Sequence, residues 1–167
     1  KHGLSLWWSL VRAGATPCGL GPRDLLRLEA GLLLHGQDID SSTTPLEAGL
    51  ERFVVLEKEF SGAQALRSQS IEGVQRRLSG FILEERSIPR HGYILKADGV
   101  TIGTVTSGSF SPSLKTSVGL AYLPKSYALP GTSIQVEIRG RNVQGYVAPL
   151  PFYARERKGE EGGRTRN

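Results

Sequence analysis

Charged side chains cluster where the sequence predicts the start of a helix. They follow a glycine and a proline, Gly21 and Pro22, and they are Arg23, Asp24, Arg27 and Glu29. A guanidinium donates two parallel N–H groups to a carboxylate, so Arg23 is a candidate for holding a planar anion. Asp24 and Arg27 are three residues apart and can instead form an ion pair along the helix. Physical chemistry alone leaves both interpretations open.

Metal and thiol chemistry have little support in the sequence. The histidines and the single cysteine lie far apart, at His2, Cys18, His35 and His91. This is not the short ligand spacing of a zinc or haem site, so we expect no metal. A lone cysteine cannot form an internal disulfide bond, and we expect Cys18 to be a small buried side chain.

Two other motifs are incomplete. Gly19-Leu20-Gly21 begins like a dinucleotide-binding fingerprint, but Asp24 stands where the third glycine belongs. The segment 104–113 is rich in hydroxyl groups but lacks the G-x-S-x-G pattern of a serine nucleophile. We expect its hydroxyl groups to satisfy backbone groups where a strand ends, and Gly108 to adopt a left-handed or bulged conformation.

The net charge of +5 comes from the C-terminal part of the chain. A basic surface can attract polyanions or acidic proteins, but few aromatic side chains accompany it for stacking on bases. We therefore expect no nucleic-acid partner. No apolar run approaches the ~20 residues of a membrane-spanning helix, and the first residues do not resemble a signal peptide, so we expect no membrane partner.

The first 70 residues read as helices and loops. Apolar residues predict a helix over 4–11 that ends before Gly14, and a second helix from Pro22. We further expect a buried strand over 53–56 and a short helix over 61–66. A polar linker that contains a domain boundary is expected to follow over 67–73.

Beyond residue 70 the pattern changes to the alternation typical of strands. Ala97-Asp98-Gly99 predicts a hairpin turn, and 144–150 reads as a last strand. About six strands fit, a number that suits a small antiparallel barrel. The fold class is therefore α+β, with domains over 1–70 and 71–156 and a charged tail, 157–167, that we expect to be disordered.

Several long segments together resemble one known family. They cover 17–31, 35–40, 43–50, 103–114 and 119–124, in that order. The resemblance is to glycine cleavage T-proteins, which are folate-dependent aminomethyltransferases, and it extends from about Leu6 to Phe152. It implies that 1–70 is an incomplete remnant of an α/β folate-binding core and that 71–156 is the C-terminal six-stranded antiparallel β-barrel.

The resemblance also implies a function. Family members transfer the one-carbon unit of an aminomethyl group, held on the lipoyl arm of H-protein, to tetrahydrofolate and release ammonia. In this chain Arg23 matches a folate-contacting position, whereas Arg27 and Glu29 are expected to brace the turn. The catalytic aspartate lies in an N-terminal part without a counterpart here, so we expect no catalytic residue in this chain, no activity of the chain alone, and an exposed apolar face around Trp7 and Trp8. The location would be cytoplasmic in a bacterium and mitochondrial in a eukaryote.

Two alternatives remain. The chain could be a non-catalytic folate-fold module whose basic barrel docks an acidic protein. It could also be a relative of the folate-binding proteins of iron–sulfur cluster assembly, although these tend to carry a cysteine motif that this sequence does not show.

Overall fold

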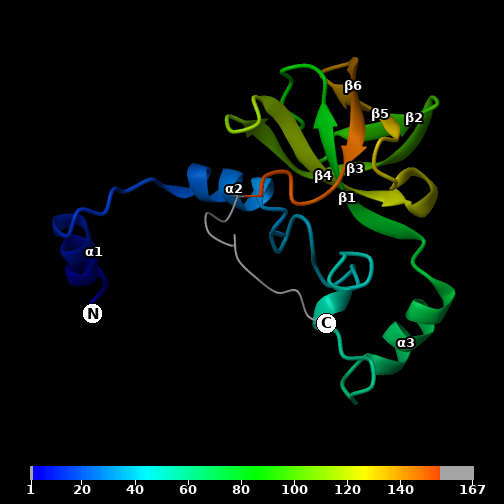
Figure 1. Ribbon diagram of the computed structural model, residues 1–167, viewed down its shortest axis with the longest axis horizontal. Coiled ribbons are helices and arrows are strands. Elements are labelled where there is room, and N and C mark those ends of the chain that lie inside the picture. The colour runs from blue at the N-terminus through cyan, green and yellow to red at the C-terminus, as the bar shows by residue number, and fades with distance from the viewer. Residues whose placement is uncertain (1, 155–167) are drawn as a thin grey trace, which may run out of the picture.

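The computed structural model describes residues 2–154, and in this range it contains three α-helices, two short 3-10 helices and six β-strands (Figure 1). The helices are α1 (Gly3–Arg12), α2 (Leu20–Glu29), η1 (Glu51–Phe53), α3 (Ala63–Glu72) and η2 (Lys125–Tyr127). The strands are β1 (Arg76–Leu83), β2 (Ile94–Ala97), β3 (Val100–Ser111), β4 (Thr116–Pro124), β5 (Ser133–Ile138) and β6 (Arg141–Ala148).

The strands close into an antiparallel barrel in the order β1-β4-β3-β2-β5-β6. Alternate residues point inward, as in β5, where Ile134, Val136 and Ile138 are buried and the residues between them are not. Asp98 and Gly99 have positive φ angles of 50° and 78° and make the tight turn between β2 and β3. The predicted α+β class, six-stranded barrel and hairpin turn are confirmed.

The helices lie to one side of the barrel. In Figure 1, α1 stands apart at the end of an extended connection, whereas α2 lies beside the barrel. Gly14 follows α1 with a φ of 95°, and its N–H bonds the Val11 carbonyl, so it ends the helix as predicted. The α2 helix begins at Leu20, two residues before the predicted start at Pro22.

Two elements of the first 70 residues differ from expectation. The predicted buried strand 53–56 is wrong: Phe53 ends the 3-10 helix η1, and 68% of its surface is exposed. Each barrel strand already has two neighbours, so no edge remains for a further strand. The predicted linker 67–73 is largely helical, because α3 runs to Glu72. The domain boundary near residue 70 stays a prediction.

Two single-residue expectations also fail. Cys18 is exposed rather than buried, as are all residues of the connection between α1 and α2. Gly108 is not left-handed, although a register shift occurs nearby between Val105 and Ser107. A Cβ at Gly108 would lie 2.0 Å from the carbonyl oxygen of Pro89, so close backbone approach is what requires glycine there.

Two remaining predictions concern the membrane and the tail. Among residues 2–154, no helix is long and apolar enough to cross a membrane. The tail 157–167, which the sequence predicts to be disordered, lies outside the described residues.

Candidate functional site

The α2 helix is anchored to the barrel through Leu28. This side chain is fully buried and belongs to a small core outside the barrel interior, together with Leu78 of β1 and Val118 and Leu120 of β4. Burying one leucine contributes about 1.5–3 kcal/mol. The polar residues on either side of Leu28 therefore meet the barrel wall at fixed positions.

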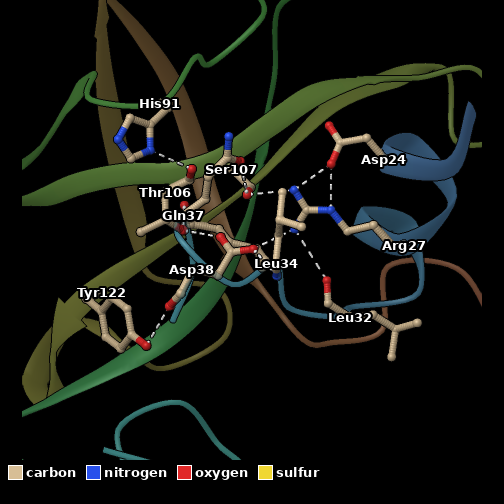
Figure 2. Close-up of polar contacts among 11 residues, drawn as sticks. Asp24, Arg27, Leu32, Leu34, Gln37, Asp38, His91, Thr106, Ser107 and Tyr122 are labelled. Carbon is tan, nitrogen blue, oxygen red and sulfur yellow. Dashed lines mark hydrogen bonds and ion pairs between the residues drawn. The ribbon is translucent and has the colours of Figure 1, made fainter. Parts of the chain in front are cut away.

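Arg27 joins α2 to the barrel through a buried set of charged and polar contacts (Figure 2). Its Nε and Nη2 atoms lie 2.8 and 2.7 Å from Asp24 Oδ1. Its Nη1 pairs with Asp38 Oδ2 at 2.5 Å, and its Nη2 donates to Ser107 Oγ of β3 at 2.8 Å. The guanidinium is thus committed to residues of this chain.

Asp38 is the buried acceptor at the centre of this network, with only 1% of its surface exposed. Besides the Arg27 guanidinium, its carboxylate accepts hydrogen bonds from Leu34 N–H at 2.9 Å and from Thr106 Oγ1 at 2.6 Å. Its backbone carbonyl accepts a bond from the Tyr122 hydroxyl. Burial raises the pKa of Tyr122, so this hydroxyl keeps its proton at neutral pH. The Arg27 guanidinium and the two hydrogen-bond donors together compensate the charge of the Asp38 carboxylate.

Glu29 makes a second buried connection. Its carboxylate accepts hydrogen bonds from Ser111 Oγ at 2.5 Å and Ser113 Oγ at 3.2 Å. Ser111 Oγ in turn accepts a bond from Leu114 N–H, and the Glu29 carbonyl accepts one from Tyr153 N–H. The end of β3 and the segment after β6 thereby hold the C-terminal end of α2.

Arg23 lies one helical turn before Arg27 and is exposed. Because Asp24 pairs with Arg27, it does not neutralise Arg23, and within residues 2–154 no ion pair or side-chain hydrogen bond engages the Arg23 guanidinium. The ion-pair interpretation of the charged cluster is therefore confirmed, because Arg27 pairs with Asp24. The anion-binding role of Arg23 stays a prediction.

Sequence reasoning identified the arginines but missed most of their partners. The bracing role expected of Arg27 and Glu29 agrees with the contacts above. The hydroxyl groups of 104–113 were expected to satisfy backbone groups; Ser111 and Thr106 do so, but they and Ser107 also bind charged side chains. The charged residues of α2 could have indicated these contacts in advance, because charged side chains need buried polar partners if their helix packs on a sheet.

A carboxylate near the network ties the loop after Asp38 to the barrel. Glu47 Oε1 accepts a bond from Arg76 Nε of β1 at 2.8 Å, and Oε2 accepts one from Thr44 N–H at 2.9 Å. Burial favours the neutral form of Glu47, but the Thr44 N–H and the Arg76 guanidinium outweigh it and lower the pKa of Glu47.

Two further features bear on ligand binding. Between residues 2 and 154, no three histidine, cysteine or acidic side chains gather as a metal site would require. A groove of about 490 Å³ lies between the segments 30–33 and 48–53 and the strands β1 and β6, and Arg23 is not among its lining residues.

Two family models match the chain and between them cover most of it. The GCVT N-terminal domain matches residues 1–58, and the glycine cleavage T-protein C-terminal barrel domain matches residues 76–154. The chain belongs to the glycine cleavage T-protein family. Its buried network joins the two matched regions, because Arg27, Glu29 and Asp38 come from the first and the hydroxyl groups of β3 come from the second.

Curated aminomethyltransferases are similar over nearly all of this chain. An aminomethyltransferase of Rippkaea orientalis is 50% identical over 153 residues, which are 90% of this chain and 42% of the relative. An aminomethyltransferase of Nostoc sp. is 50% identical over 159 residues, which are 94% of this chain and 42% of the relative. The chain therefore spans less than half the length of these relatives.

A solved T-protein structure has the same fold. The glycine cleavage system aminomethyltransferase T from Bartonella henselae matches 90% of this chain and 44% of its own, with a TM-score of 0.85 and 38% sequence identity. The resemblance seen in the sequence is confirmed at the level of family and fold.

Proposed function

We propose that this chain is part of a tetrahydrofolate-dependent aminomethyltransferase of the glycine cleavage system. In the proposed reaction, the one-carbon unit of an aminomethyl group on the lipoyl arm of H-protein passes to tetrahydrofolate, and ammonia is released. Family membership and the names of the curated relatives support the proposal. Because the chain spans less than half of those relatives, the activity is proposed for a complete enzyme that contains it.

The observation that carries the proposal for this chain is the exposed guanidinium of Arg23 on an anchored helix. Leu28, Arg27 and Glu29 fix α2 on the barrel, so the position of Arg23 is set by buried contacts. Tetrahydrofolate ends in a glutamate tail, and an arginine donates two parallel N–H groups to such a carboxylate. Arg23 would bind and orient the ligand, whose own nitrogen atoms supply the nucleophile for the one-carbon unit.

No catalytic residue is proposed within the chain. The resemblance implies that the family's catalytic aspartate lies in the N-terminal part that this chain does not match, so we expect the isolated chain not to catalyse transfer. A positioned carboxylate from the remaining part of a T-protein would adjust the protonation of the reacting nitrogen. The proposed partner is lipoylated H-protein, and the proposed location is the cytoplasm of a bacterium, or the mitochondrion if the source is a eukaryote.

A chimera tests the role of Arg23. In it, this chain replaces the 153 matched residues of the Rippkaea orientalis aminomethyltransferase. Arg23→Ala is expected to weaken tetrahydrofolate binding, measured by calorimetry, by about 10- to 100-fold, and Arg23→Lys by less, because lysine keeps the charge without the paired geometry. Arg90→Ala is the matched control, because Arg90 is also exposed but lies in a barrel loop.

The outcomes separate the residue assignment from the activity. Equal affinities for the parent chimera and Arg23→Ala would show that Arg23 does not contact the ligand. A chimera that binds tetrahydrofolate but does not release ammonia from aminomethyl-lipoyl H-protein would favour a non-catalytic folate-fold module. Binding that depends on salt but not on tetrahydrofolate would favour the protein-docking alternative.

A further inference from the structure

Strand β3 is irregular at Thr106. Val105 stands opposite Ala121 of β4, and Ser107 stands opposite the neighbouring residue, Leu120. Thr106 is therefore an extra residue that faces no partner on β4, which makes this position a β-bulge. A bulge changes the direction in which the side chains around it point, so its effect on the buried network follows from its geometry.

The bulge lets two consecutive side chains reach the buried network. Residues of a regular strand point alternately to its two faces. Here the Thr106 hydroxyl donates to Asp38 Oδ1 at 2.6 Å, and the very next hydroxyl, that of Ser107, accepts from Arg27 Nη2 at 2.8 Å. Both partners lie outside the barrel. A β3 strand without the bulge would turn one of the two hydroxyl groups toward the barrel interior.

The loop between β1 and β2 contacts the bulge directly. Its backbone pairs with the residue before the bulge, because the Gly92 N–H donates to the Val105 carbonyl and the Val105 N–H donates to the Tyr93 carbonyl, each at 2.8 Å. The bulge itself is bound by a side chain: His91 Nδ1 lies 2.8 Å from the Thr106 carbonyl oxygen (Figure 2). Because a carbonyl oxygen only accepts, Nδ1 carries the hydrogen atom and donates it.

We propose that His91 is a positioning residue for α2 and, through this helix, for Arg23. Its hydrogen bond holds the bulge in the conformation that turns Thr106 and Ser107 toward the network, and the network sets the position of α2. Arg23 lies four residues before Arg27, about 6 Å along the helix axis, so a shift of α2 displaces its guanidinium. The inference rests on the proposed function where it names tetrahydrofolate as the ligand of Arg23.

Two variants of nearly equal shape test the hydrogen bond. Leucine and asparagine both branch at Cγ, but only the asparagine amide can donate from a position close to that of Nδ1. In urea denaturation of the full chain, His91→Leu is expected to raise the equilibrium constant of unfolding about fivefold, and His91→Asn is expected to keep it near the parent value. Because His91 is exposed, both variants are expected to fold.

A double-mutant cycle tests whether this bond acts through the bulge. The Ser107 hydroxyl binds Arg27 rather than His91, so coupling between the two positions reports the conformation of β3. We expect His91→Leu and Ser107→Ala together to raise the unfolding constant at least about threefold less than the product of their single effects. Ser111→Ala is the matched control, because Ser111 also joins β3 to α2, through Glu29, but lies beyond the bulge. With Ser111→Ala, the effect of His91→Leu is expected to multiply.

The chimera with the Rippkaea orientalis aminomethyltransferase tests the effect on the ligand. His91→Leu is expected to weaken tetrahydrofolate binding, measured by calorimetry, about three- to tenfold and to raise the KM for tetrahydrofolate by the same factor without changing kcat. His91→Asn is expected to restore the affinity. In the Ser107→Ala background, His91→Leu is expected to add little further loss. A role in stability alone would not separate KM from kcat in this way.

Three results would overturn the proposal. Effects of His91→Leu and Ser107→Ala that multiply in unfolding would show that the bulge does not depend on the imidazole. An unchanged tetrahydrofolate affinity in His91→Leu would show that the bulge does not set the ligand site. An affinity loss that is equally large in the Ser107→Ala background would identify direct contact of His91 with the ligand.

The proposed function fails in a different way. A chimera that binds tetrahydrofolate but does not transfer the one-carbon unit would contradict the proposed activity, while the calorimetric test of His91 would still decide its role. An affinity that falls in His91→Leu but not in Arg23→Ala would contradict Arg23 as the ligand contact and would overturn the step of the inference that runs through it.

Discussion

Within residues 2–154, Asp24 pairs with Arg27, one turn further along α2, and not with the adjacent Arg23. The Oδ1 atom of Asp24 lies 2.7 Å from Nη2 of Arg27. This pairing gives the two arginines different roles. Arg27 is buried, with acceptors on α2, on the following loop and on β3, whereas Arg23 remains exposed. Stability and ligand binding should therefore depend on different arginines of the same helix.

Arg27→Met tests the structural half of this division. Methionine fills a similar volume but leaves the carboxylate of Asp38 buried without a counter-charge, which costs about 3–5 kcal/mol. Urea denaturation is expected to show this loss in the free energy of unfolding, and Arg23→Met is expected to change it by less than about 0.5 kcal/mol. Equal losses in the two variants would contradict the division of roles.

Ser111→Ala tests the second connection between α2 and the barrel. The Ser111 hydroxyl donates to the buried Glu29 carboxylate and accepts from Leu114 N–H, so its removal leaves two polar groups short of a partner. We expect a loss of about 1–3 kcal/mol in the free energy of unfolding. Ser109→Ala is the control on the same strand, because the Ser109 hydroxyl makes no hydrogen bond within residues 2–154. A similar loss of stability in Ser109→Ala would argue against the contact between Ser111 and Glu29.

The stability contribution of Glu47 should depend on pH. Its pKa is lower in the folded chain than in the unfolded chain, so its ionised form stabilises the fold above the unfolded pKa of about 4.5. This stabilisation is lost as the pH falls through the folded pKa. We expect Glu47→Gln to cost roughly 1 kcal/mol at pH 7, a modest value because Arg76 is partly exposed to solvent. The difference from the parent chain is expected to shrink as the pH falls below 4.5 and through the folded pKa. A difference that stays constant over this range would mean that the charge of Glu47 is not the cause.

The sequence predicted the barrel more accurately than the surroundings of α2. Alternation along segments such as 134–138 depends on nearest neighbours in the chain, so it predicts inward and outward positions directly. Arg27 and Asp38 form a buried pair, and their hydroxyl partners on β3 lie about 70 to 80 positions further along the chain. No local sequence pattern encodes such contacts. The strand predicted at 53–56 failed for a related reason, because an apolar run becomes a strand only where a neighbouring edge is free. Arg23 was singled out because its chemistry is local to one helix start.

Gly108→Ala tests whether close backbone approach, rather than turn geometry, requires glycine at this position of β3. The added Cβ would lie 2.0 Å from the Pro89 carbonyl oxygen, and a backbone atom cannot move aside as a flexible side chain can. We expect a loss of more than about 2 kcal/mol in the free energy of unfolding, because β3 or the loop at Pro89 must shift. Gly21→Ala is the control, since nothing lies within 4 Å of a Cβ there and the substitution favours the helix by about 0.5–1 kcal/mol.

Moving β3 would also displace Ser107 from Arg27, so Gly108→Ala combined with Arg27→Met should cost less than the sum of the two single changes. Strictly additive losses would show that the strand accommodates the methyl group without disturbing the buried network.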